Sequence, residues 1–86
     1  MTAPHIFADF NNCDQKYRIR LNVVGSLRDI AMLPAPLTDG ALVTLADGEG
    51  EFEVDATVAF TGKIWVATPM WETKRSLVAK HKIRRS

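Results

Sequence analysis

Only a few residues of this chain carry side chains that could act as a nucleophile or a base. Cys13 is the only thiol, and His5 and His81 are the two imidazoles. A nucleophilic cysteine needs an imidazole within hydrogen-bonding distance and a third group that orients it. Asp14 follows Cys13, but no neighbouring helix start or fixed cation is present to lower the thiol pKa. We expect no catalytic residue and interpret Cys13 as a small apolar side chain beside a turn.

Metal and phosphate chemistry have equally little support in the sequence. One cysteine and two histidines cannot supply the four paired ligands of a zinc site within one chain. The glycines also lack the spacing of a loop that wraps around a phosphate, since they stand at Gly25, Gly40, Gly48, Gly50 and Gly62. We therefore expect neither a metal nor a cofactor.

A row of carboxylates is the next candidate for chemistry. Glu51, Glu53 and Asp55 alternate along one segment, which places them on one face of a strand about 6.5 to 7 Å apart. Glycosidases use two carboxyl groups at a comparable separation, but in a cleft that removes one of them from water. We interpret this row instead as charges on a solvated strand, which discourage pairing with a foreign strand.

A protein-binding surface is the function that the residue types favour. Tryptophan and arginine are enriched among the residues that dominate binding energy at protein interfaces. The segment "ATPMWETKR" follows a predicted strand and suggests a partner surface formed by Trp65, Met70, Trp71 and Arg75. The alternative is that Trp65 belongs to the core and Trp71 covers the mouth of a barrel.

Binding of single-stranded nucleic acid is the alternative function. Aromatic side chains stack on bases and basic side chains follow the phosphates. The residues available for this surface are Tyr17, Arg18, Arg20, Lys80, Lys82 and Arg84. A net charge of +1 and a pI of about 7.9 argue against it, because nucleic-acid-binding domains are usually more basic.

The charges are distributed unevenly along the chain. Six of the ten acidic residues lie between Asp39 and Asp55, and six of the eleven basic residues lie in the last thirteen positions. This pattern predicts head-to-tail self-association or two faces of opposite charge. Ordinary solvated strands followed by a basic tail remain the simpler alternative.

The elements that would position these residues are mostly short strands. "YRIRLNV", residues 17–23, alternates so that Tyr17, Ile19, Leu21 and Val23 share one face. Further strands are predicted in "ALVTLADG", in residues 51–60 and in "KIWVAT", with turns between them. Phe52, Val54, Ala56, Val58 and Phe60 form the apolar face of the clearest strand.

The segment after residue 25 has two interpretations. Ser26 followed by Asp29 resembles a capping box, and Pro34 would end the element, which favours a short helix at about 27–33. A hairpin turning at Gly25 and Ser26 is the alternative. Residues 77–86 are either an added edge strand or a basic tail outside a single β-barrel domain formed by residues 1–76.

Together these elements predict a mainly β fold, a small antiparallel barrel of about five strands with one short helix. The stretch "LTDGALVTLADGEGEFEVDATVAFTGKIWVA" resembles the SH3-like small barrels, and residues 26–67 are similar to some uncharacterised small bacterial barrel proteins. The resemblance covers about half of the chain and implies a fold, but it carries over no functional residue.

The sequence shows neither a signal peptide nor an apolar run long enough for a membrane helix, so we expect a cytoplasmic protein without a membrane partner. The functional hypothesis is a non-catalytic protein-binding or adaptor module that binds a protein partner or a second copy of itself as a homodimer.

Overall fold

The computed structural model describes residues 3–48 and 50–76. Within these residues the chain forms one helix, a short 3-10 turn and six strands. In chain order they are β1 (His5–Phe7), β2 (Ile19–Arg20), α1 (Val24–Ala31), β3 (Leu42–Ala46), β4 (Phe52–Phe60), β5 (Trp65–Pro69), η1 (Trp71–Thr73) and β6 (Arg75–Ser76). The predicted fold class, mainly β with a single short helix, is confirmed.

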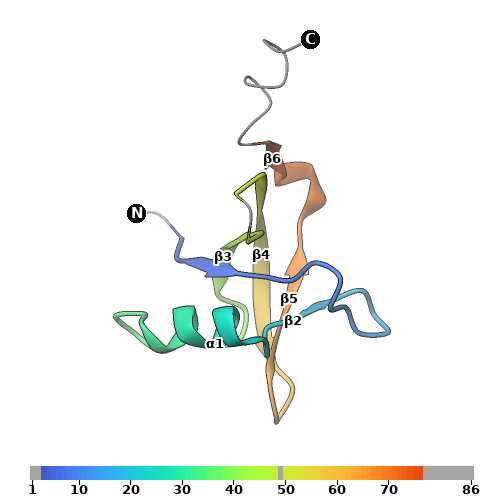
Figure 1. The fold of residues 1–86 in the computed structure, drawn as a ribbon. Helices are drawn as coiled ribbons and strands as arrows, with labels where there is room; N and C mark the ends of the chain where they lie inside the picture. Colours follow the sequence, from blue (N-terminus) through green and yellow to red (C-terminus); the bar gives the residue numbers. More distant parts are fainter. Residues whose placement is uncertain (1–2, 49, 77–86) are drawn as a thin grey trace, which may run out of the picture.

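The strands form one curled sheet that closes only half of a barrel (Figure 1). Their order is β1-β3-β4-β5-β2, and β6 pairs separately with β4. The β3–β4 and β4–β5 pairs are antiparallel as expected, whereas β1 runs parallel to β3. The sheet is therefore mixed rather than wholly antiparallel, because the long segment containing β2 and α1 separates β1 from β3 in the chain.

The central strand β4 follows the predicted alternation. Val54, Ala56 and Val58 are buried, while Thr57 between them is exposed. Phe60, the last residue of the predicted apolar face, is 48% exposed at the end of the strand. The neighbours of the buried residues on β3 are equally buried, because Val43 pairs with Ala56 and Leu45 with Val54. The core is completed from other elements by Ile6, Ala8, Ile19, Leu21 and Ala67.

β5 and β6 pair with different parts of β4, and the β4 backbone between these two parts is also hydrogen-bonded. After Pro69 the chain bulges outward through η1, and β6 then pairs with the start of β4. In the gap, Met70 N–H donates to the Asp55 carbonyl (2.8 Å), and Asp55 N–H donates to the Thr73 hydroxyl (2.9 Å). Thr73 thus replaces a missing strand residue.

The predicted strand over residues 17–23 is much shorter in the structure. Ile19 and Leu21 are buried as predicted, but Tyr17 is 82% exposed and has a φ of 63°. It lies in a loop held by Asp14, whose Oδ1 accepts hydrogen bonds from the backbone N–H groups of Lys16 and Arg18 (both 2.9 Å). Because aspartate readily bonds to backbone a few residues ahead, it favours a turn here over continued alternation.

The helix alternative is confirmed for the segment after residue 22, with different ends. α1 spans Val24–Ala31 rather than about 27–33. The capping-box interpretation was wrong, since the helix start has no side-chain cap and Ser26 lies inside the helix, where it is buried. Ser26 and Asp29 instead bind to β1, as described below.

The tail or edge strand predicted at 77–86 lies outside the described residues. Among the residues that are described, no helix is long and apolar enough to cross a membrane.

Candidate functional site

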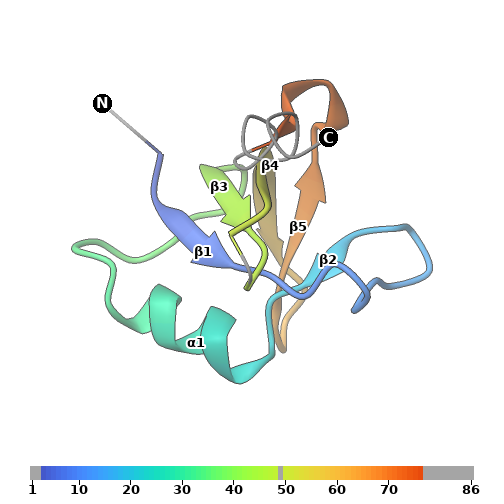
Figure 2. The ribbon, with the colours of Figure 1, turned by 45° about the horizontal axis from the view of Figure 1, so that its top comes forward.

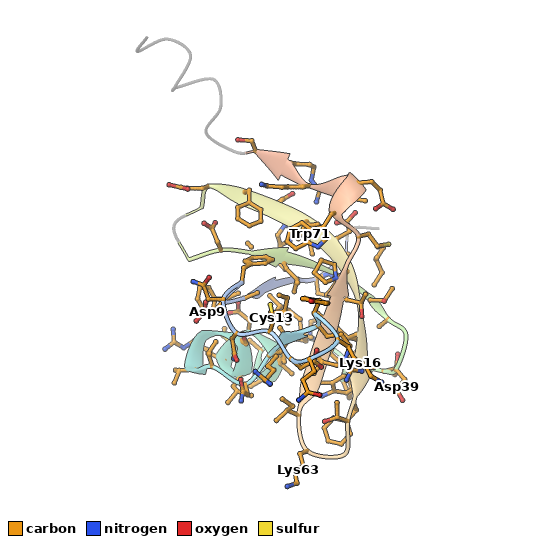
Figure 3. The ribbon with its side chains drawn as sticks, turned by 90° about the vertical axis from the view of Figure 1, so that its right-hand side faces the viewer. Asp9, Cys13, Lys16, Asp39, Lys63 and Trp71 are labelled. Carbon is orange, nitrogen blue, oxygen red and sulfur yellow. The ribbon has the colours of Figure 1, made fainter. Side chains whose placement is uncertain are left out.

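The two tryptophans of the predicted partner surface lie at opposite ends of β5. Trp65 begins β5 and packs against Phe60 across the hairpin, with ring centroids 5.2 Å apart. Trp71 follows the end of β5, and Figure 3 shows it at the far end of the molecule from Lys63, which lies in the β4–β5 turn. A five-residue strand spans roughly 17 Å. The two rings therefore do not form one binding surface.

Trp71 belongs to an aromatic cluster at the upper end of the sheet. Its ring lies 5.9 Å from that of Phe10, which in turn packs against Phe52 at 4.8 Å. The Lys74 ammonium lies 4.6 Å from the centroid of the Phe52 ring, in cation–π geometry. Trp71 remains 52% exposed, so it covers part of this end of the sheet and also presents a free face.

The carboxylate row binds Arg75, the last residue of the predicted partner surface. The Arg75 guanidinium lies 2.9 Å from Glu53 Oε2 and 3.0 Å from Asp55 Oδ1. Hydrogen bonds from Arg75 and from the Thr44 hydroxyl lower the pKa of Asp55, and the same contact with Asp55 raises the pKa of Arg75. Arg75 therefore connects β6 to β4.

His5 lies at the edge of the same polar network. Its Nε2 is 3.4 Å from Glu53 Oε1, and its side chain is 61% exposed on an open sheet face. Cys13 lies elsewhere, with its thiol donating to the Phe10 carbonyl at 3.4 Å. Among the described residues no hydrogen bond or ion pair connects Cys13 with His5, and no group of three potential ligands could hold a metal ion. His81 is outside the described part.

The arginines of the alternative nucleic-acid surface are bound within the protein. Arg18 Nε donates to Asp14 Oδ2 at 2.8 Å, and Arg20 donates to the Cys13 carbonyl at 2.7 Å. The backbone N–H of Arg18 makes the largest contribution to a lowered pKa of Asp14. Tyr17 stands exposed on the same loop. The other members, Lys80, Lys82 and Arg84, lie outside the described residues.

An exposed apolar surface that sequence reasoning missed is the outward face of α1. Val24 is 72% exposed, Leu27 52%, and Met32, directly after the helix, 76%. Val24, Leu27 and Ala31 follow the spacing of one helix face, because residues three and four apart are neighbours on a helix. We call Val24, Leu27, Ala31 and Met32 the α1 face.

The opposite side of α1 is polar and binds the edge of the sheet. Asp29 Oδ2 accepts the backbone N–H of Phe7 at 2.7 Å, and the Ser26 hydroxyl donates to the Phe7 carbonyl at 2.5 Å. β1 is an edge strand, so this side of Phe7 has no strand partner in the sheet. Ser26 and Asp29 therefore bind the backbone of this edge, and Ile30 packs against the core, whereas Val24 and Leu27 face outward.

A close backbone approach accompanies this arrangement. A Cβ atom on Gly25 would lie 2.5 Å from Cδ2 of Phe7, and one on Gly48 would lie 2.7 Å from Cε1 of the same ring. The Phe7 ring is thus held between the helix and the β3–β4 turn. Only glycine at position 25 allows α1 to lie this close to β1.

An apolar groove continues from the end of the α1 face. It has a volume of about 600 Å³ and lies between the start of β1 and the proline-containing loop after the helix. Leu33, which follows Met32 directly, lines it together with Leu37 and Leu42. Figure 2 shows α1 and this loop at the outer side of β1, away from the rest of the sheet. The α1 face and the groove form one candidate docking surface.

The sequence contains a signal for this surface. Gly25, Ser26 and Asp29 cluster on one side of the helix, and Leu27 and Ala31 lie on the other. The sequence predicts only a short helix here, and a surface helix usually turns its apolar side toward the core. Comparisons of the chain with protein-family models, with curated proteins and with solved structures found no match.

Proposed function

We propose that this protein is a non-catalytic protein-binding module that docks through the α1 face, and that the occupant of this face is a second copy of the chain. The observation that carries the proposal is the orientation of α1. Ser26 and Asp29 bind the edge of β1, while Val24, Leu27 and Met32 remain exposed to water. Contiguous exposed apolar surface is typical of interaction sites.

A second copy fits this face for a geometric reason. In a two-fold symmetric dimer the same patch is buried on both subunits, so an apolar patch meets another apolar patch. Arg28 is the only charged residue on the exposed side of the helix, where it lies one turn from both Val24 and Met32, and Asp29 is occupied by Phe7 N–H. If the two helices meet along Leu27, the long Arg28 side chain lies at the edge of the contact and keeps its charged end in water.

The exposed area predicts a weak dimer. Complete burial of Val24, Leu27 and Met32 contributes about 4 kcal/mol per copy, given how much of each is still exposed. Association costs at least about 4 kcal/mol in lost freedom of motion. Because both copies contribute, about 4 kcal/mol remains after the lowest association cost, which corresponds to a dissociation constant of roughly 1 mM for the α1 face alone. Burial of the adjoining groove lowers the dissociation constant toward about 10 µM.

Light scattering over a concentration series up to about 1 mM tests this proposal. We expect the mean mass to rise with concentration toward twice the monomer mass. Leu27→Asp places a charge in the centre of the contact and should weaken association at least tenfold, because an unpaired buried charge is costly. Circular dichroism would verify that the variant remains folded.

Thr68→Asp is the matched control for this experiment. Thr68 is exposed on β5, and β4 separates it from Leu42 of the groove, so the substitution adds the same charge away from the docking surface. We expect it to leave the concentration dependence unchanged. A wild-type chain that stays monomeric throughout the series would refute the dimer, as would equal effects of both substitutions.

The finer assignments remain part of the proposal. The curled half-barrel and the resemblance of residues 37–67 support an SH3-like barrel, and the free Cys13 agrees with a cytoplasmic protein. Trp71, together with Met70 and Arg75, would form a secondary surface at the other end of the sheet. Trp65 would act as part of the core, since it packs against the buried residues.

Single-stranded nucleic acid is the second candidate, favoured by the exposure of Tyr17 between Lys16 and Arg18. An exposed ring flanked by cations could stack on a base. Titration with single-stranded DNA at low and high salt separates the two candidates, because phosphate contacts weaken as salt rises. We expect no binding at low salt. Salt-sensitive binding that Tyr17→Ala weakens would favour the second candidate.

A further inference from the structure

A second hollow lies between the end of β1 and the β3–β4 turn, on a different part of the molecule from the α1 face. Its volume is about 370 Å³, and the rings of Phe7, Phe10 and Phe52 line it together with the carboxylates of Asp9 and Asp47. We call it the aromatic cleft. Its chemistry suits a group with an apolar stem and a positive end, because lysine and arginine combine these two features.

The two carboxylates of the aromatic cleft accept hydrogen bonds from backbone N–H groups. Asp9 Oδ1 accepts the Asn11 N–H at 3.0 Å, and Asp47 Oδ1 accepts the Glu51 N–H at 2.8 Å. Within residues 3–48 and 50–76 neither carboxylate forms an ion pair. Both carboxylates are therefore available to a cation from another segment.

The aromatic cluster beside the cleft already holds one cation of the chain. Lys74 Nζ lies 4.6 Å from the centroid of the Phe52 ring, and Phe52 is itself a wall of the cleft. β6 then places Ser76 directly opposite Phe52. The chain therefore leaves the described structure next to this wall, and ten further residues can span up to roughly 33 Å.

The charge of the remaining segment is complementary to that of the rest. Residues 1–76 contain ten acidic and seven basic side chains, which is a net charge of −3. Residues 77–86 contain no acidic side chain and four basic ones, Lys80, Lys82, Arg84 and Arg85, which is +4 and restores the total of +1. Opposite charges at this separation in the sequence favour contact between the two parts.

We propose that the aromatic cleft binds the basic C-terminal segment of the same chain, residues 77–86. The aliphatic stem of a lysine or arginine lies against Phe10 and Phe52, and its charged end pairs with Asp9 or Asp47. Cation–π contact and exposed ion pairs are individually weak, so the docking is reversible and sensitive to salt. The proposal is independent of the α1 face.

The test uses amide NMR spectra of the full chain and of three single variants or sets of variants. Replacing Lys80, Lys82, Arg84 and Arg85 together by serine should shift the amides of Asn11, Gly48 and Phe52, which surround the cleft. The amides of Phe60 and Thr61 should stay unchanged. A peptide with the sequence of residues 77–86, added to this tail variant, should restore the original positions in a saturable way.

Asp47→Asn and Asp39→Asn form a matched pair for the same peptide titration. Each aspartate accepts backbone N–H groups through Oδ1, since Asp39 binds the Phe60 N–H at 2.7 Å. Figure 3 shows Asp39 on the opposite side of the molecule from Asp9, which lines the cleft. Asparagine keeps an oxygen for the backbone bonds and removes only the charge. Asp47→Asn in the tail variant should weaken peptide binding about two- to fivefold, and Asp39→Asn should leave it unchanged.

The outcomes distinguish local docking from a general charge effect. Equal weakening by Asp47→Asn and Asp39→Asn would overturn the proposal, as would tail variants whose cleft amides do not shift. Shifts that grow with protein concentration would also overturn it, because they would mean that the tail docks on another copy. Loss of the cleft shifts at about 0.5 M salt, where exposed charges are screened, would support it.

Discussion

The outer face of β4 and the outer face of α1 present opposite chemistry to solvent. On β4, Glu53 and Asp55 are bound by Arg75 and by the hydroxyl of Thr44, so the polar groups are satisfied within the chain. On α1, Val24 is 72% exposed and Leu27 52%. The carboxylates of β4 thus help to hold strands together, whereas the outer face of α1 leaves apolar side chains in water.

The type of a residue therefore does not by itself indicate its use. Arg75 is a typical interface residue, yet here it fastens β6 to β4. Ser26 and Asp29 are typical helix caps, yet they complete the edge of β1. In both places an edge or a short strand needed polar partners, and the nearest polar side chains supplied them.

The largest predicted effect comes from detaching α1 from β1. Asp29→Ala removes the charged acceptor of the Phe7 N–H, which is partly buried, and should lower the free energy of unfolding by about 1.5 to 3 kcal/mol. Urea denaturation followed by tryptophan fluorescence would measure the loss. If the α1 face is the docking surface, dimerisation should weaken in the same variant, because the helix would no longer be held in place.

Asp29→Asn serves as the control for this prediction. Asparagine keeps an oxygen that can accept the same N–H, and a neutral hydrogen bond contributes about 0.5 to 1.5 kcal/mol. The asparagine variant should therefore lose less than the alanine variant. Equal stability of Asp29→Ala and wild type would show that Asp29 does not hold the helix.

A smaller effect is predicted for the close approach of helix and strand. Gly25→Ala places a Cβ 2.5 Å from Cδ2 of Phe7, and Gly48 approaches the other side of the same ring. Overpacking costs about 1 to 3 kcal/mol, and the better helix propensity of alanine offsets about 1 kcal/mol. We expect a net loss of about 1 kcal/mol in thermal or urea unfolding.

The second variant needed here is Phe7→Leu, which makes the side chain smaller. Gly25→Ala should cost less in the Phe7→Leu background than in the wild type, because the clash is relieved. A stabilising effect of Gly25→Ala in the wild type would mean that helix propensity outweighs the contact, and that α1 can move away from β1 at little cost.

The smallest effect is expected on β4, where the charges are exposed. Hydrogen bonds from Arg75 lower the pKa of Asp55 below its usual value of 3.8. A carboxyl group with a lowered folded-state pKa stabilises the fold above its unfolded pKa, and this contribution disappears as the pH falls through the folded pKa. Wild type should therefore lose more stability than Arg75→Gln between pH 5 and acid, as measured by urea unfolding at several pH values. Identical pH profiles would contradict the pairing.

Much of the sheet could be predicted because its signals are local. β4 alternates over nine residues, and Gly62, with a φ of 98°, marks the turn to β5 as expected. The strand predicted from residue 17 failed at its start, because alternation of Tyr17 with Ile19 gave no indication that Asp14 bonds to the backbone ahead of it. The parallel pairing of β1 could not be predicted, since it depends on where a long connection returns.

The candidate surface was harder to predict than the fold. Trp65 and Trp71 are close in sequence, but β5 separates them, so proximity in the chain was misleading. The α1 face has an apolar pattern that predicts burial on a sheet. The α1 face points outward because Asp29 on the other side of the helix binds the backbone N–H of Phe7, which has no strand partner. This free backbone edge forms only after β1 has paired with β3.

An isotope-filtered NOE experiment on a mixture of labelled and unlabelled chains near 1 mM shows directly whether a second copy covers the α1 face. We expect intermolecular contacts to the methyl groups of Val24, Leu27 and Met32, and none to the Ala59 methyl on β4. Intermolecular contacts confined to other residues, or none from a sample that light scattering shows to be monomeric, would contradict it.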